Sequence, residues 1–175
     1  MEKLSKSKIY FIVVAAIALL ALILVITTST ITYQNAKKAI AEIGVVDYSE
    51  TSKAKIDDAQ LKLDQFNSTF GASTTFASVH KNLGIEDLQK AKAKYVEAAI
   101  RDVNKKYLNG VSDDEIKAQL KDIRTTVDAY FEDKDYSLIS NYSKLTSLET
   151  EFGSAATAGG ESSGSQQAAE EPEIC

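Results

Sequence analysis

Residues 9–26 read IYFIVVAAIALLALILVI, an unbroken apolar run of eighteen residues. As a helix rising ~1.5 Å per residue this run is ~27 Å long, and its continuation through Thr27–Ile31 exceeds the ~30 Å hydrocarbon core of a bilayer. Tyr10 and Tyr33 stand near its two ends, where aromatic rings settle at membrane–water interfaces. The sequence therefore predicts a single transmembrane helix, with the lipid bilayer contacting residues 9–31.

A cleaved signal peptide is the alternative for residues 1–31. A signal peptide has a shorter apolar stretch, of about 7–15 residues, and a small-x-small cleavage site. Here the run is longer, and Thr27–Thr30 follow it in place of an Ala-x-Ala site. These differences favour a retained anchor. Its lipid-contacting residues are expected to include Ile9, Tyr10, Phe11, Leu19, Leu20, Leu24, Ile26 and Tyr33.

Lysines on the two sides of the run predict its orientation. Lys3, Lys6 and Lys8 adjoin the N-terminal side, whereas Lys37 and Lys38 lie several residues beyond the other end. Because cytoplasmic flanks carry the excess of Lys and Arg, this small asymmetry favours a cytoplasmic N-terminus. The expected product is a single-pass protein of the cell membrane, with the rest of the chain extracytoplasmic.

The C-terminal segment 153–175 reads GSAATAGGESSGSQQAAEEPEIC and contains no Lys or Arg. Such a sequence buries too little apolar surface to offset its ordering entropy, so it predicts a disordered tail. Residues 32–152, between anchor and tail, have the length of one ordinary domain. Cys175 is the only cysteine, so it cannot form an intramolecular disulfide. It either joins a partner chain through an intermolecular disulfide or has no function.

The segment between anchor and tail is predicted to be helical. Pro172 is the only proline, so nothing before it forbids continuous helix. Apolar residues recur at helical spacing in four stretches, spanning 56–70, 96–107, 116–130 and 138–152. Each stretch is apolar on about one face, as in helices that pack against one another. The predicted fold class is all-α, with an up-down bundle of about four helices behind the transmembrane helix.

Helix-boundary signals cluster around residue 110. Ser112 and Glu115 have the spacing of a capping box, in which each side chain accepts a backbone N–H of the other residue. Val111 and Ile116 occupy the two positions of a hydrophobic staple. Gly110 suits the left-handed residue that ends the preceding helix. Together they predict a helix–turn–helix connection here.

Weaker signals place the other boundaries. Gly44 is expected to end the helix that leaves the membrane, and Ser49 to cap the helix that follows. Asn141 and Tyr142 are interpreted as the cap and a core residue of the last helix. Residues 67–82, rich in Ser and Thr, predict a loop.

Signals for catalysis or metal binding are weak. His80 is the only histidine and is interpreted as a surface residue. The acidic group Glu132, Asp133 and Asp135 lacks the Gly and distal Glu of a calcium loop. The chain has no Trp for a sugar platform and no Gly-rich phosphate loop. Its net charge of −5 argues against nucleic acid as a partner. We therefore expect no enzyme activity, cofactor or metal.

Two segments resemble parts of a known helical repeat. Residues 39–66, AIAEIGVVDYSETSKAKIDDAQLKLDQF, resemble the opening of a repeat in surface and secreted proteins of Gram-positive bacteria. Residues 129–152, AYFEDKDYSLISNYSKLTSLETEF, are similar to its closing part. In the family the two parts adjoin, whereas residues 67–128 separate them here, as an insertion or as part of a second copy. The resemblance implies an extracytoplasmic, non-catalytic spacer or binding module.

Two functions remain open on the sequence. The first is a membrane-anchored extracytoplasmic module that binds, spaces or scaffolds protein partners of unknown identity, including further copies of itself. The second is a four-helix sensor domain that binds a small ligand. Because the sequence has no second apolar run, such a sensor would have to signal through a partner in the membrane.

Overall fold

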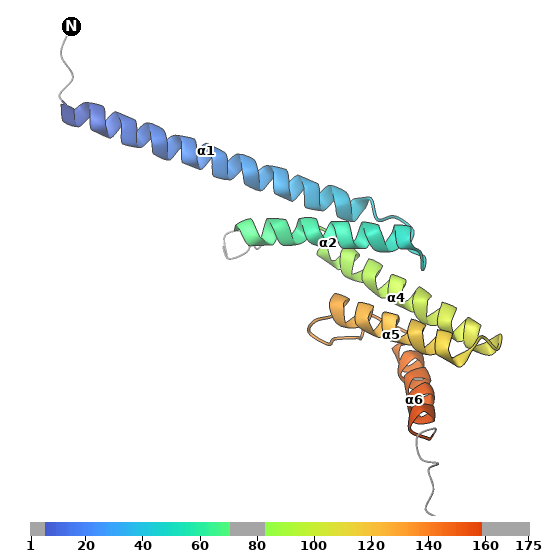
Figure 1. Ribbon diagram of the computed structural model, residues 1–175. Helices are drawn as coiled ribbons and strands as arrows, with labels where there is room; N and C mark the ends of the chain where they lie inside the picture. Colours follow the sequence, from blue (N-terminus) through green and yellow to red (C-terminus); the bar gives the residue numbers. More distant parts are fainter. Residues whose placement is uncertain (1–5, 71–82, 159–175) are drawn as a thin grey trace, which may run out of the picture.

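The computed structural model of the chain describes residues 6–70 and 83–158, and helices account for most of them. No strand occurs in these two ranges, so the predicted all-α class is confirmed. The helices are α1 (Lys6–Ala41), α2 (Glu50–Phe70), α4 (Ile85–Leu108), α5 (Asp113–Tyr130) and α6 (Tyr142–Ala158). They form a staggered array from which α1 projects far beyond the others (Figure 1).

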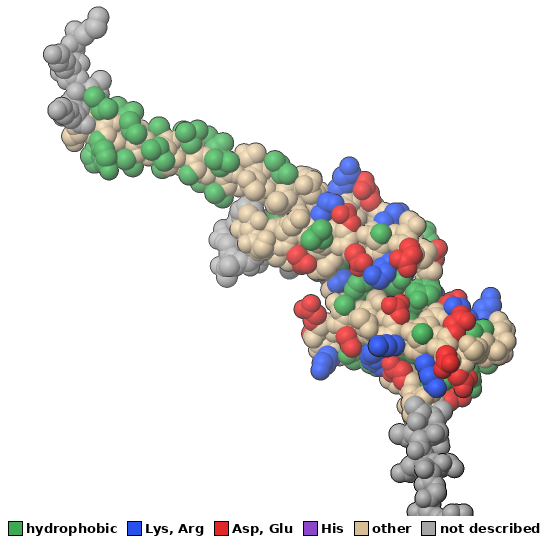
Figure 2. All heavy atoms as spheres, in the orientation of Figure 1, with side chains coloured by type: hydrophobic (Ala, Val, Ile, Leu, Met, Phe, Trp, Pro, Cys, Tyr) green, Lys and Arg blue, Asp and Glu red, His purple; other side chains and the backbone are tan. Residues whose placement is uncertain are grey.

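Helix α1 is unbroken over 36 residues and leads from the predicted membrane segment into the helical domain. Its stretch Ser7–Ala41 is long and apolar enough to cross a membrane. The large apolar side chains between Ile9 and Ile26 are about half exposed or more, and Figure 2 shows them as a green sleeve around the projecting part. The N-terminal apolar helix is thus confirmed, and it continues into the domain without a break.

A first core joins the last turns of α1 to α2 and to the first half of α4. Small side chains at Ala36 and Ala39 of α1 and at Ala59 of α2 are buried where the helices meet. The predicted apolar face of α2 is buried here, down to Phe66 at 1% exposure. The residues of this first core are Ala36, Ala39, Ile40, Ile43, Ile56, Ala59, Leu63, Phe66, Leu83, Leu88, Ala91 and Tyr95.

A second core lies between the second half of α4, α5 and α6. The predicted stripe of α5 is buried as expected, with Ile116, Ile123 and Val127 at 0–1% exposure. Because α4 contributes to both cores, it connects the two halves of the domain. The residues of this second core are Ala93, Val96, Ala99, Ile100, Val103, Ile116, Leu120, Ile123, Val127, Phe131, Ile139, Leu145, Leu148 and Phe152.

The connection from α1 to α2 agrees with the predicted boundary signals. Gly44 has φ +69°, a left-handed conformation that favours glycine. The Ser49 hydroxyl accepts the backbone N–H of Ser52 at 3.2 Å, so Ser49 caps α2. The Asp47 carboxylate accepts both serine hydroxyls, and these hydrogen bonds lower the pKa of Asp47.

The turn between α4 and α5 confirms the predicted glycine but not the capping box. Gly110 has φ +73°, and Val111 and Ile116 pack in the same second core. The Ser112 side chain makes no capping hydrogen bond. The carboxylate of Glu115 instead lies 3.5 Å from the ammonium of Lys106 on α4. The capping-box prediction is therefore wrong, because a tertiary ion pair draws Glu115 away from the helix end.

Three other boundaries differ from expectation. Helix α2 runs to Phe70, past the start of the predicted loop at residue 67, and the hydroxyls of Ser68 and Thr69 donate to the Gln65 carbonyl. Leu138, placed on the last apolar stripe, lies before α6 and is 49% exposed. Helix α6 ends at Ala158, inside the segment predicted as a tail. The rest of that tail and the loop residues 71–82 lie outside the described residues.

Candidate functional site

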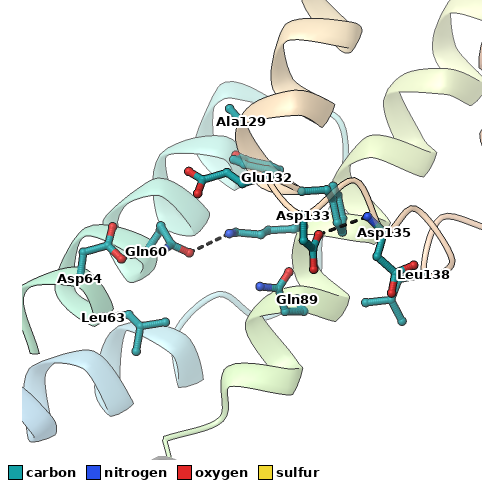
Figure 3. A pocket seen from close by; sticks show the side chains of 12 residues that line it. Gln60, Leu63, Asp64, Gln89, Ala129, Glu132, Asp133, Asp135 and Leu138 are labelled. Carbon is teal, nitrogen blue, oxygen red and sulfur yellow. Dashed lines mark hydrogen bonds between the residues drawn. The ribbon is translucent and has the colours of Figure 1, made fainter. Parts of the chain in front are cut away.

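A cleft of about 530 Å³ lies between α2, α4 and the segment that follows α5. Figure 3 shows Gln60 and Asp64 of α2 on one side and Asp133 and Asp135 on the other, with Gln89 of α4 between them. The lining residues are Gln60, Leu63, Asp64, Gln89, Lys92, Ala129, Tyr130, Phe131, Glu132, Asp133, Asp135 and Leu138. This cleft borders both cores, because α2 belongs to the first and α5 to the second.

Among the described residues, Lys92 is the one basic side chain that lines the cleft, and it is only 4% exposed. Its ammonium donates to Oε1 of Gln60 at 2.7 Å and lies 5.3 Å from the centre of the Tyr130 ring. A neutral amide and a ring face stabilise a buried cation less than a paired carboxylate does. Burial lowers the pKa of Lys92, and the carboxylates of Asp64, Glu132 and Asp57 offset part of this shift.

Tyr130, which lines the cleft, and Tyr48 each pack against both cores. The Tyr130 hydroxyl donates to Asp57 of α2 at 2.8 Å, and its ring lies edge-on to Tyr95 with the centroids 6.3 Å apart. Burial, together with the hydrogen bond to Asp57, raises the pKa of Tyr130. Tyr95 in turn lies 5.5 Å from Tyr48. The Tyr130–Asp57 hydrogen bond therefore connects α5 to α2, and the Tyr130–Tyr95 ring contact connects α5 to α4.

The acidic segment after α5 is held by its own hydrogen bonds. Lys134 turns the chain with φ +58°. The carboxylate of Asp133 accepts the backbone N–H of Asp135, and the carboxylate of Asp135 accepts that of Ser137. Hydrogen bonds from the side chain and the backbone N–H of Ser137 lower the pKa of Asp135. Within the described residues, no group of three or more His, Cys, Asp or Glu side chains is placed to hold a metal ion.

Contacts to Glu97 of α4 anchor the end of this segment. Its carboxylate accepts the Ser140 backbone N–H at 2.8 Å and the Ser140 hydroxyl at 2.6 Å. The Asn141 side-chain amide donates to the Glu97 carbonyl at 3.1 Å. Asn141 thus stands just before α6 as predicted, but its side chain bonds α4 instead of capping α6.

Arg124 of α5 joins α5 to α6. Its guanidinium makes a two-pronged contact with the Glu149 carboxylate and donates to the Tyr142 hydroxyl at 2.7 Å. The Tyr142 ring stacks on Tyr136, with centroids 4.3 Å apart. Tyr142 is half-buried beside the second core, which agrees with its predicted core role.

The structure places the predicted lipid-contacting residues on α1. Ile9, Tyr10, Phe11, Leu19, Leu20, Leu24 and Ile26 are 50–72% exposed. Tyr33 differs, because its ring packs against Phe66 of α2 at 6.0 Å and is half-buried in the first core. Cys175 and His80 lie outside the described residues.

The cleft combines four carboxylates, one buried ammonium and two aromatic rings, and its described lining contains no serine, cysteine or histidine. Such a set can bind a small polar ligand through charge and hydrogen bonds. Sequence reasoning missed Lys92. A signal existed, since Lys92 lies four residues after Leu88 and four before Val96, on the buried face of α4.

Comparison with known proteins gives no match among family models, curated proteins or solved structures. The resemblance to Gram-positive surface repeats therefore stays a prediction.

Proposed function

We propose that this chain is a membrane-anchored helical module that holds or spaces protein partners at the outer face of the cell membrane. One observation carries the proposal: α1 exposes apolar side chains along its first part and is buried in the first core along its last turns. A helix with this division fits a lipid environment on one side and a folded domain on the other. The lysine asymmetry around the apolar run favours a cytoplasmic N-terminus.

The continuity of α1 suits a spacer. A helix without a break transmits its direction to the domain, whereas a flexible linker would let the domain reorient. Ala36 and Ile40 are 0–6% exposed, so the last turns of α1 are packed inside the core of the domain. A partner bound to α5 or α6 would therefore be held at a fixed distance from the bilayer.

Fractionation of cells that express the full chain tests the anchor. The chain is expected in membranes after an alkaline carbonate wash, which removes peripheral proteins. A matched variant with Leu19, Leu20 and Leu24 all changed to Glu should leave the membrane fraction, because charge at the centre of a span is costly. Recovery of the unaltered chain in the wash would contradict the anchor.

Crosslinking in native membranes tests the partner. A photoreactive residue at exposed Lys121 on α5 is expected to give a discrete higher-mass product, either with another protein or with a second copy. The same residue at Leu24, inside the apolar part of α1, reports contacts within the membrane. A chain that yields only monomer at every exposed position of α5 and α6 would contradict a scaffolding role.

The cleft supports a second candidate function, a sensor of small polar ligands. The observation that favours it is the buried ammonium of Lys92 beside an open cleft. A thermal-shift screen of the full chain in detergent, against amino acids and small organic acids, tests it. A saturable shift that disappears in Lys92→Met but persists in Lys94→Met, which is exposed on the same helix, would support sensing.

A further inference from the structure

Helix α2 runs back along α1, and its last residues lie beside the part of α1 where the apolar stretch ends. The rings of Tyr33 on α1 and Phe66 on α2 lie 6.0 Å apart, and the two helices run side by side in opposite directions (Figure 1). Helix α2 continues from Phe66 to Phe70, which is ~6 Å at ~1.5 Å per residue. Its last residue is therefore level with about Ser29 of α1.

Two stretches that meet around this level carry no charged residue. Residues 27–36 of α1 read TTSTITYQNA and residues 65–70 of α2 read QFNSTF, and we call these two stretches the collar. Charged residues make up 26% of the chain, so sixteen positions (ten plus six) would ordinarily hold about four. The collar holds none. Figure 2 shows a mostly tan region, without red or blue, between the green projecting part of α1 and the red and blue surface of the domain.

The serine and threonine hydroxyls of the collar donate hydrogen bonds within their own helices. Thr27 donates to the Ile23 carbonyl at 2.7 Å, and Thr69 donates to the Gln65 carbonyl at 2.8 Å. A hydroxyl with an internal partner enters a poorly hydrated layer at lower cost than one that depends on water. The others that do so are Thr28, Ser29, Thr30, Thr32 and Ser68.

The collar lies at the position along α1 where a headgroup layer is expected. A hydrocarbon core of ~30 Å takes about twenty helical residues, so a core that begins at Ile9 ends near Thr28. The headgroup region adds roughly 5–8 Å on each side, or about four or five residues, which reaches Tyr33. The first charges beyond it are Asp64 on α2 and Lys37 on α1, and the Lys37 ammonium lies 5.9 Å from the centre of the Tyr33 ring.

We propose that the collar lies in the lipid headgroup layer, so that the last turn of α2 contacts the bilayer together with α1. This rests on the proposed anchoring of α1. Two helices in the headgroup layer, in place of one, fix both the height and the direction of the domain. The lipid surface is thus a second binding partner of the domain, reached through Gln65–Phe70.

The absence of tryptophan from the chain makes a direct test available. Single tryptophans at exposed Ser68 and Thr69 report the end of α2, and Leu61→Trp is a matched control on α2 about 10 Å farther from the bilayer. Leu19→Trp reports the anchor. Each full-length variant is reconstituted in phosphatidylcholine vesicles with and without lipids brominated near the headgroups or deep in the acyl chains.

We expect Ser68→Trp and Thr69→Trp to emit at shorter wavelength than Leu61→Trp and to lose intensity with the headgroup-proximal bromine. Leu61→Trp should keep its intensity, and Leu19→Trp should lose intensity with the deep bromine. Quenching of Leu19→Trp without quenching of Ser68→Trp or Thr69→Trp would show that the end of α2 does not contact the headgroup layer, while the anchoring of α1 would still hold. Absence of quenching at Leu19→Trp overturns the anchor itself. Circular dichroism of each variant confirms that the helices are retained.

Discussion

The hydroxyl of Tyr130 donates a 2.8 Å hydrogen bond to Oδ1 of Asp57, a residue 73 positions earlier in the chain. It joins α5 to α2 and therefore the second core to the first. The same ring covers the ammonium of Lys92. Tyr130 thus adds a direct contact between the two halves of the domain to the connection that α4 provides.

Tyr130→Phe is expected to lower the free energy of unfolding by about 1 kcal/mol, because it leaves the ring and removes the hydrogen bond. Urea denaturation of the detergent-solubilised chain, followed by circular dichroism, measures the change. A double-mutant cycle with Asp57→Asn isolates the pair. Additive effects of the two substitutions would show that the Tyr130–Asp57 contact contributes nothing.

Alkaline pH should destabilise the domain through its buried tyrosines. Burial raises the pKa of Tyr95 from 10.0 to about 12, so the folded state retains the proton that the unfolded chain releases. Stability is then complete below pH 10.0 and falls as the pH rises toward 12. Tyr95→Phe should reduce the slope of stability against pH in this window. Tyr10→Phe, outside the domain, should leave the slope unchanged, and equal slopes for all three proteins would contradict the prediction.

Lys92→Met should leave the domain as stable as before or stabilise it by up to about 1 kcal/mol. The substitution keeps most of the buried side chain and removes a cation that contacts the neutral Gln60 amide and the Tyr130 ring. Lys94→Met, on the exposed face of α4, is the control. A loss of several kcal/mol in Lys92→Met alone would mean that the ammonium is a structural requirement, which weakens its assignment to a ligand.

Arg124→Lys should lower stability by about 1 kcal/mol. Lysine cannot reproduce the two-pronged contact with Glu149 together with the hydrogen bond to Tyr142, and the pair is still 27–30% exposed, which limits the effect. Arg101→Lys, on an exposed position of α4, provides the matched control, since Arg101 and Arg124 are the only arginines. Thermal melting of the detergent-solubilised proteins measures both. Equal melting temperatures for the two variants would exclude a specific role for Arg124.

Local patterns in the sequence predicted much of the fold. The spacing of Ile116, Leu120 and Val127 indicated a buried face of α5, and these residues are at most 4% exposed. Gly44 and Gly110 marked turns that need positive φ. Both signals depend on near neighbours in the chain, which the sequence displays directly.

Features that depend on distant residues were not predictable in the same way. Glu115 forms an ion pair with Lys106 on α4 instead of capping α5, and the Asn141 side chain donates a hydrogen bond to the Glu97 carbonyl on α4. Lys92 looks like a surface residue until α2 and α5 cover it. The division into two cores along α4 is likewise a result of how the helices stack, which no single apolar stripe encodes.

The central claim is that α1 spans the membrane with the helical domain outside, and the single native cysteine tests it most directly. Intact bacterial cells that express the chain are treated with a membrane-impermeant maleimide, and labelling of Cys175 is compared with labelling after lysis. A Glu2→Cys, Cys175→Ser variant reports the other end of the chain. The account predicts that Cys175 is labelled in intact cells and that the cysteine at position 2 is labelled only after lysis. Labelling of position 2 but not of Cys175 in intact cells would contradict it.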